Sequence, residues 1–291
     1  SVALQSVEKF TQTYPNSVYS KETKSLYVTA LAYSNDFNKA YDAYQNMDTL
    51  DEALLKLYPN ILFGKAALSI NDGQNEKAYE LFNQVKNIPY NKNVLAQTYF
   101  WIGELAYKMG RIDEAIEHLE KYILDPIEIG EITKKHANYT LGYCHLKNNN
   151  YTKALQLFTI AADFNPYTES SAYQKDALVR LSDCQFMTKQ YKQALKSYQK
   201  IIDLGWNLED YATLQKAIIY GALGLNKEKL KILNSYDTEF SQSKYLSDAR
   251  MELADTYTSK EQFQEAISPL SKVLVDNKAT EFYPLAFYKL G

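Results

Sequence analysis

The side chains that could do chemistry are few in this sequence, and their spacing does not bring them together. The three histidines are His118, His136 and His145. Cys144 precedes His145, but adjacent residues on a helix point about 100° apart, so these two side chains do not face each other. No set of His, Cys and carboxylate residues has the spacing of metal ligands, and no Gly-rich turn between a strand and a helix could hold a phosphate. The sequence therefore predicts no catalytic residue, no metal site and no cofactor.

The composition excludes several classes of protein. The chain has 291 residues, of which 46% are hydrophobic, and its mean hydropathy is -0.42. No apolar run approaches the roughly 18 residues that a membrane-spanning helix needs. The net charge is -3, so the chain has no basic field for nucleic acid. Four lysines with helical spacing are better explained as a solvated outer face than as a site for nucleic acid or anionic lipid: Lys189, Lys192, Lys196 and Lys200.

A short phrase recurs along the whole chain. The pattern begins with Asn, Gly, Lys or Glu. An aromatic residue, Ile or Asn stands two positions later, and an Ala stands three positions after that. The Ala residues of successive copies are separated by 38, 37, 39, 40 and then 72 residues, and the last interval holds one degenerate copy at Lys229. A repeat of this length is typical of stacked repeat architectures, which present a surface for a partner. The six clear copies end at Ala40, Ala78, Ala115, Ala154, Ala194 and Ala266.

Each copy reads as a pair of helices. From Ala96, apolar residues recur with helical spacing until Gly110, which is suited to a left-handed helix end. A second helical pattern follows, with acidic residues in its first turn, and ends before Pro126. Small residues, such as Gly103 and Ala115, are expected where the two helices approach most closely. The repeating unit is therefore predicted to be a hairpin of two antiparallel helices.

This pattern resembles the tetratricopeptide repeat. The copy that begins near residue 135 shows the resemblance best: Leu141, Gly142, Tyr151, Ala154, Phe158, Ala161 and Pro166. The resemblance implies an all-α superhelix, a solenoid of about seven full hairpins with a half repeat at each end. It covers residues 1–291 as one continuous array, with repeats that start near 21, 59, 96, 135, 175, 210 and 247. A second-helix half precedes the first repeat, and a first-helix half follows from Pro284.

Several positions depart from the family pattern. Each step exceeds the usual repeat of about 34 residues, so we expect lengthened loops between repeats. Lys229 replaces a packing Ala, which predicts a loose or shifted sixth hairpin. Pro269 lies within a predicted second helix and is expected to kink it or delay its start. Cys144 and Cys184 are one repeat apart, too far for a disulfide if repeats stack at helix-packing distance.

In this family the first helices line the inner face of the superhelix, and this chain places aromatic and acidic residues there. Such a strip would suit an extended peptide or an amphipathic helix of a partner. The alternative is that the rings stack between neighbouring first helices and meet no ligand. The residues expected to bind the partner are Phe100, Trp101, Glu104, Tyr107, His136, Tyr139, Tyr143, Asp183 and Phe186.

One binding chemistry known in the family is not expected here. Some members grip the acidic C-terminus of a chaperone with Lys and Asn residues. Where an Asn would be needed, this chain has other residues: Thr29, Ala67, Glu104, Tyr143 and Asp183.

The sequence leaves three functions open. The first is a non-enzymatic scaffold that binds a protein or peptide partner in the concave groove. The second is a docking or regulatory region of a larger enzyme, or of a secretion or envelope-assembly machine. The third is a receptor for a peptide signal in transport or chaperoning.

Two short phrases suggest where the protein comes from. Tyr14-Pro15-Asn16-Ser17 resembles a linkage common in bacterial envelope tetratricopeptide proteins. The stretch from Gln215 to Lys229 is similar to a degenerate repeat in large arrays of the Bacteroidetes. They imply a bacterial protein of the periplasm or outer membrane. Both ends of the chain fall inside helical patterns, so we expect it to be a fragment of a longer array.

Overall fold

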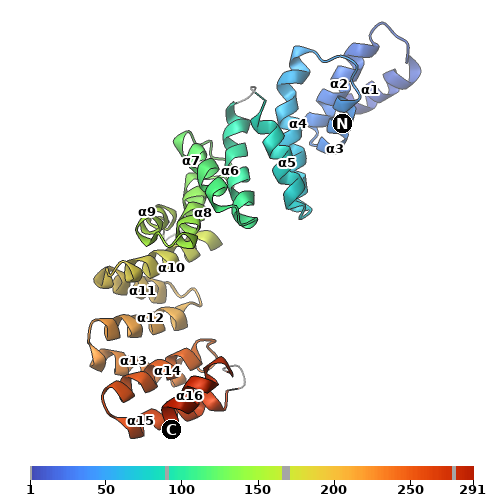
Figure 1. Cartoon of the computed structure of the whole chain (residues 1–291). Coiled ribbons are helices and arrows are strands. Elements are labelled where there is room, and N and C mark those ends of the chain that lie inside the picture. Colours follow the sequence, from blue (N-terminus) through green and yellow to red (C-terminus); the bar gives the residue numbers. More distant parts are fainter. Residues whose placement is uncertain (1, 89–91, 166–170, 277–279) are drawn as a thin grey trace. The chain divides into compact units, whose positions relative to one another are not determined.

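The computed structural model describes residues 2–88, 92–165, 171–276 and 280–291, and within these ranges the chain is helical with no strand. Only an isolated bridge joins Ile129 and Ile132. The chain divides into two compact units, Ser1–Asn150 and Tyr151–Gly291. Figure 1 shows the helices following one another as antiparallel pairs within each unit. The all-α hairpin architecture predicted from the sequence is confirmed.

Unit 1 contains eight helices among its described residues. Each packs against the next along the chain, and the first helices of consecutive hairpins also contact one another, α2 with α4, α4 with α6 and α6 with α8. The first helices therefore form a layer of their own. The helices are α1 (Val2–Thr13), α2 (Ser20–Tyr33), α3 (Phe37–Gln45), α4 (Glu52–Asn71), α5 (Asn75–Lys86), α6 (Lys92–Lys108), α7 (Ile112–Leu124) and α8 (Lys134–Lys147).

Unit 2 continues the same alternation in its described residues, and each helix again packs against the next. A 3-10 turn, η1 (Thr280–Phe282), precedes the last helix, which has Pro284 in its first turn. The helices are α9 (Tyr151–Ala161), α10 (Ala172–Met187), α11 (Tyr191–Leu204), α12 (Glu209–Ala222), α13 (Asn226–Glu239), α14 (Leu246–Ser259), α15 (Phe263–Leu274) and α16 (Tyr283–Leu290).

The recurring phrase marks the turn of each hairpin. Its first residue adopts a positive φ in every clear copy, from 55° at Asn149 to 76° at Gly110, and Gly224 does so in the degenerate copy. The next residue donates its N–H to a carbonyl five residues back, as Gln74 does to Ser69. This is a Schellman cap, which satisfies carbonyls at the helix end. Lys189 and Glu261 adopt the same left-handed geometry without being glycine, at φ 60°.

Small residues set the spacing inside a hairpin, as expected. A Cβ added to Gly103 would lie 2.5 Å from Cγ of Leu119 and 3.3 Å from the carbonyl oxygen of Ala115. Ala115 and Leu119 are fully buried. The backbones of α6 and α7 can approach this closely only because residue 103 has no side chain.

The structure corrects or refines three expectations. α15 begins at Phe263 and continues through the buried Pro269, so this proline does not delay the helix start. α4 begins at Glu52, capped by Asp51, well before the expected repeat start at 59. Lys229 lies beside Gly221 and pairs with Glu252 of α14 at 2.6 Å, so the sixth hairpin accommodates it. Pro166, part of the best-matching copy, lies outside the described residues.

The loop that joins α7 to α8 is longer than a hairpin turn, and hydrogen bonds hold it in place. Tyr122 is fully buried, and its hydroxyl donates to the carbonyls of Ile127 and Ile132 at 3.3 and 3.2 Å. Thr133 caps α8 by accepting from the backbone N–H of His136. The added residues between these two repeats are thus ordered by hydrogen bonds.

Candidate partner-binding surface

The residues predicted to bind a partner fall in both units. Phe100, Trp101, Glu104 and Tyr107 lie on α6, and His136, Tyr139 and Tyr143 lie on α8 of the same unit. The remaining two, Asp183 and Phe186, lie on α10 of unit 2. Because α6 and α8 contact each other, the first seven residues form one neighbourhood.

Five rings in this neighbourhood form a connected chain, which we call the aromatic row: Phe100, His136, Tyr139, Tyr143 and Tyr107. The successive ring centroids are 5.4, 6.2, 5.1 and 6.2 Å apart. These are typical distances for tilted and edge-to-face aromatic pairs. The last four rings of the row are half-buried, so they present part of their surface.

Phe100 has a different role from the rest of the row. Its side chain is 0% exposed. Edge-to-face contacts hold it against Trp101 at 5.3 Å and Tyr122 at 5.4 Å. Phe100 therefore packs between helices, as the alternative interpretation of these rings holds, and cannot touch a partner directly in this structure.

Glu104 is a buried carboxyl group beside the aromatic row. Its residue is 8% exposed, and its Oε1 atom is buried without a hydrogen-bond partner. Burial raises the pKa of Glu104, although the charges of His136 and Lys108 and a hydrogen bond with Thr140 act in the opposite direction. Burial, and then the charge of Glu104, raises the pKa of the nearby Cys144 thiol to about 12. This thiol is therefore a packing group rather than a nucleophile.

Asp183 on α10 is partly buried, with a side chain that is 22% exposed, and its oxygens have donors. Oδ1 accepts from the hydroxyls of Tyr198 at 2.5 Å and Tyr211 at 2.8 Å, and Oδ2 accepts from Arg180 at 2.8 Å. Burial raises its pKa despite these hydrogen bonds. The three donors come from α10, α11 and α12, so Asp183 ties two consecutive hairpins together. Phe186, on the same helix, stacks at a tilt on Tyr191 at 5.8 Å.

The sequence did not reveal an apolar cavity of about 400 Å³ in unit 1. First-helix residues of α2, α4 and α6 line most of it, with the turn after α2 at one end. Small side chains leave the space open, and the exposed Tyr33 stands at its edge. The only sequence signal is a set of small residues on two first helices, Ala32 of α2 with Gly64 and Ala67 of α4. The lining residues are Ala32, Tyr33, Asn35, Phe37, Leu57, Asn60, Phe63, Gly64, Ala67 and Val94.

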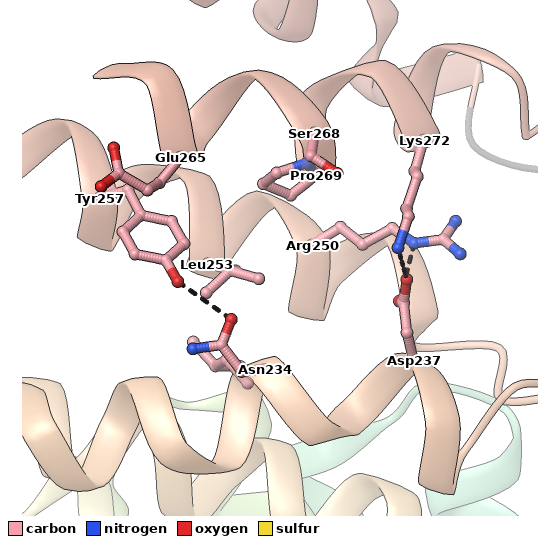
Figure 2. Close-up of a pocket in the computed structure, with 10 residues that line it drawn as sticks. Asn234, Asp237, Arg250, Leu253, Tyr257, Glu265, Ser268, Pro269 and Lys272 are labelled. Carbon is pink, nitrogen blue, oxygen red and sulfur yellow. Dashed lines mark hydrogen bonds and ion pairs between the residues drawn. The ribbon is translucent and has the colours of Figure 1, made fainter. Parts of the chain in front are cut away.

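A second cavity, of about 290 Å³, lies in unit 2 between α13, α14 and α15. Figure 2 shows Arg250 and Lys272 meeting Asp237 at one side and Tyr257 meeting Asn234 at the other. Asp237 accepts from Nε of Arg250 at 2.9 Å and from Nζ of Lys272 at 2.7 Å. The Asp237 carboxylate of α13 is thus paired with cationic side chains of α14 and α15.

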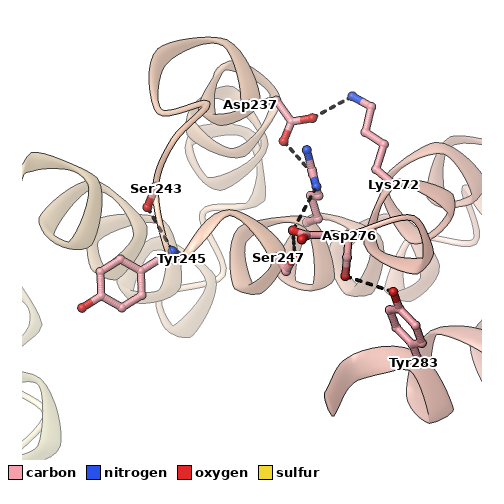
Figure 3. Close-up of polar contacts among 8 residues, drawn as sticks. Asp237, Ser243, Tyr245, Ser247, Lys272, Asp276 and Tyr283 are labelled. Atoms are coloured by element: carbon pink, nitrogen blue, oxygen red, sulfur yellow. Dashed lines mark hydrogen bonds and ion pairs between the residues drawn. The ribbon is translucent and has the colours of Figure 1, made fainter. Parts of the chain in front are cut away.

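The pairing continues to the end of the last hairpin. The Arg250 guanidinium also lies 3.9 Å from Asp276, which accepts from the Ser247 hydroxyl at 3.0 Å. The carbonyl of Asp276 accepts from the Tyr283 hydroxyl of α16 at 3.0 Å (Figure 3). This network joins α13, α14, α15 and α16, and it could not be predicted from the sequence because its members are far apart along the chain.

Two further properties bear on the class of protein. Within the four described ranges, no three His, Cys, Asp or Glu residues are grouped so that they could hold a metal ion. The described helices also include none that combines the length and the apolar character needed to cross a bilayer.

Stacked helical hairpins, with first helices that contact one another in unit 1, define an α-helical repeat protein. Family models described as tetratricopeptide repeat match residues 102–169 and 176–204. The chain thus contains tetratricopeptide repeats over these two ranges, and its other helical hairpins share their fold. A comparison with curated protein sequences gives no match.

Solved structures share the fold. The C-terminal part of a tetratricopeptide repeat protein from Cytophaga hutchinsonii matches with a TM-score of 0.62 and 16% identity, covering 91% of this chain and 98% of that one. A tetratricopeptide repeat protein from Parabacteroides merdae matches with a TM-score of 0.57 and 16% identity, covering 75% and 79%. YrrB, described as having an unusual peptide-binding site, matches with a TM-score of 0.51 and 21% identity, covering 72% and 97%.

Proposed function

We propose that this protein is a non-enzymatic scaffold whose first-helix layer in unit 1 binds an extended peptide or an amphipathic helix of a protein partner. The apolar cavity beside α4 carries this proposal. Its volume of about 400 Å³ is in the range of ligand-binding pockets, which are mostly apolar with a few polar groups. A cavity of this kind can take the anchoring side chain of a partner.

The aromatic row supports the same surface. Tyr residues are common at protein interfaces because they combine a large apolar area with a polar group and lose little conformational entropy. Tyr107, Tyr139 and Tyr143 each present part of a ring on the first-helix layer. The net charge of -3 supports a protein partner over nucleic acid.

Filling the cavity tests the proposal. Ala67→Trp places a large ring in the cavity, and we expect it to weaken capture of the native partner at least tenfold. Lys77→Trp adds the same ring to an exposed position on α5 and is the matched control. A photo-reactive amino acid at Tyr139 should cross-link the partner, whereas one at Lys77 should not. Equal cross-linking from both positions would show that the first-helix layer is not the binding surface.

The second candidate is a docking or regulatory region within a larger enzyme or an envelope-assembly machine. The tetratricopeptide fold is compatible with either, because both use the array as a binding surface. The full-length reading frame separates them: a catalytic domain in the same chain would favour the second candidate.

For its location we propose the periplasm or outer membrane of a bacterium. Support comes from the phrase at Tyr14-Pro15-Asn16-Ser17 and from the degenerate repeat between Gln215 and Lys229. Fractionation of the native cell tests this, and recovery in the cytosolic fraction would reject it.

A further inference from the structure

His118 lies on α7 with its imidazole enclosed by neighbouring helices. The residue is 3% exposed, and the ring of Tyr99 of α6 stacks on it with the ring centroids 5.9 Å apart. We infer that protonation of His118 loosens the contact between α5 and α7 by drawing the Glu114 carboxylate away from Tyr79. This acid-sensitive junction lies between the hairpins α4–α5 and α6–α7, and it is independent of the function proposed above.

Glu114 is the group that His118 and Tyr79 share. Its Oε1 atom accepts a hydrogen bond from the Tyr79 hydroxyl of α5, and the same atom lies 3.9 Å from Nε2 of His118. The guanidinium of Arg111 lies 3.8 Å from the other oxygen. A movement of about 1 Å would bring Oε1 within hydrogen-bond distance of Nε2. A protonated His118 adds a positive charge that the Tyr79 hydroxyl does not have, so it competes for this oxygen.

The neutral imidazole suits its site better than the imidazolium does. Nδ1 of His118 is buried and has no hydrogen-bond partner. In the imidazolium both ring nitrogens carry a proton, so Nδ1 would become a buried donor without an acceptor, which costs free energy. Nε2 can gain an acceptor from Glu114. Protonation therefore strains one side of the ring and pulls on Glu114 at the other.

The charged groups that act most on His118 come from α5 and α7. Burial lowers the pKa of His118, and the positive charges of Lys86 of α5 and Lys121 of α7 lower it further. Glu117 and Glu114 raise it, but Lys121 pairs with Glu117 at 2.6 Å. Since the folded-state pKa is lowered, stability is complete above the unfolded pKa of about 6.5 and is lost as pH falls through the folded pKa. The junction is thus intact at neutral pH and weakened in acid.

Neighbouring hairpins show that the packing does not require a histidine at this place. His118 stands three residues after the packing Ala115. At the same distance from their own packing Ala, α5 has Leu81 and α9 has Leu157, both buried. An apolar side chain therefore fills this position elsewhere in the chain, and only an ionisable ring gives the junction a response to pH.

An NMR titration of the His118 ring between about pH 4 and 8 tests the exchange of partners. In the wild type the midpoint should lie below the ordinary value of about 6.5. Tyr79→Phe frees Glu114 to pair with His118, so the midpoint should rise by about half a pH unit or more. Tyr41→Phe is the matched control, because Tyr41 occupies the equivalent position one repeat earlier, and it should leave the midpoint unchanged.

Amide hydrogen exchange tests whether the junction loosens. His118→Leu introduces the side chain that α5 and α9 have at this place and removes the titrating group. Wild type and variant are compared at the same pH, so that the intrinsic exchange rate cancels. The ratio of wild-type to variant exchange in α5 and α7 should be about fivefold larger near pH 5 than near pH 7.5, because local openings report local contacts.

Three results would overturn the inference. His118 could stay neutral throughout the titration, or its midpoint could be the same in Tyr79→Phe as in the wild type. The exchange ratio could also be equal at both pH values, in which case His118 serves in packing alone.

Discussion

At the scale of single residues, Glu104 is a carboxyl group whose ionisation is opposed by its buried surroundings. Burial raises its pKa above the ordinary value, the charges of His136 and Lys108 notwithstanding. A carboxyl group whose pKa is raised on folding stabilises the fold least when it is ionised. Ionising this carboxyl group in the folded protein therefore costs stability.

Glu104→Gln should accordingly stabilise unit 1 at neutral pH by on the order of 1 kcal/mol, because a neutral group of the same shape avoids the desolvation of the charge. Because the folded-state pKa is raised, the wild type has its full stability below the unfolded pKa of about 4.3 and loses it as pH rises through the folded pKa. The difference between variant and wild type should thus be small near that pH and grow above it.

Urea unfolding at several pH values measures this difference. The chain has two tryptophans, so a Trp206→Phe background leaves Trp101 of α6 as the reporter of unit 1. Glu120→Gln, on the exposed side of α7, should show no such trend. A constant difference across pH would mean that Glu104 is not desolvated in the folded protein.

At the scale of helices, the cost of adding a methyl group inside a hairpin depends on whether the neighbouring side chain can move. Gly103→Ala should destabilise unit 1 by about 1–3 kcal/mol, because its Cβ would lie 2.5 Å from Cγ of the buried Leu119. Gly221→Ala should cost less, since its Cβ would lie 3.0 Å from Cδ of Lys229, a flexible side chain that can shift. Thermal unfolding of the two variants tests this, and equal costs would contradict the role given to Leu119.

The hairpins themselves could be predicted because their signals are local. Turn residues such as Gly110 and Asn149 stand at fixed offsets from the packing Ala, and the structure places them in the left-handed geometry that a Schellman cap needs. The residue at which a helix begins could be predicted less well than the turn at which it ends. Residues before 59 join α4 with Asp51 as cap, because neighbouring helices provide packing that a repeat pattern does not record.

The candidate site could be predicted only in part. Periodicity placed Phe100 and Tyr107 on one first helix, but it could not show that Phe100 is enclosed by Trp101 and Tyr122. The cavity beside Ala67 arises from several small side chains on separate helices. Burial and empty space depend on contacts between repeats, and a single sequence does not state them. Binding of a partner at these residues stays a prediction.

At the scale of the whole molecule, stability in a repeat array is a sum of local contributions, since each repeat contacts only its neighbours. The network of hydrogen bonds and ion pairs around Asp237 is one such local contribution to the stability of unit 2. Burial opposes ionisation of Asp237, but hydrogen bonds and charges from Lys272 and Arg250 hold its pKa below the ordinary value. Its contribution to stability is therefore present above the unfolded pKa of Asp and is lost as pH falls through the folded pKa.

Asp237→Ala should destabilise the end of unit 2 by about 2 kcal/mol, because it leaves Arg250 and Lys272 without their shared acceptor. Amide hydrogen exchange should become faster in α13, α14 and α15 and stay unchanged in α4 to α7, since local openings report local contacts. Glu265→Ala removes an exposed carboxylate from the same cavity and should change exchange little. Faster exchange throughout both units after Asp237→Ala would show that the array unfolds as one cooperative body, and would contradict a purely local role for this network.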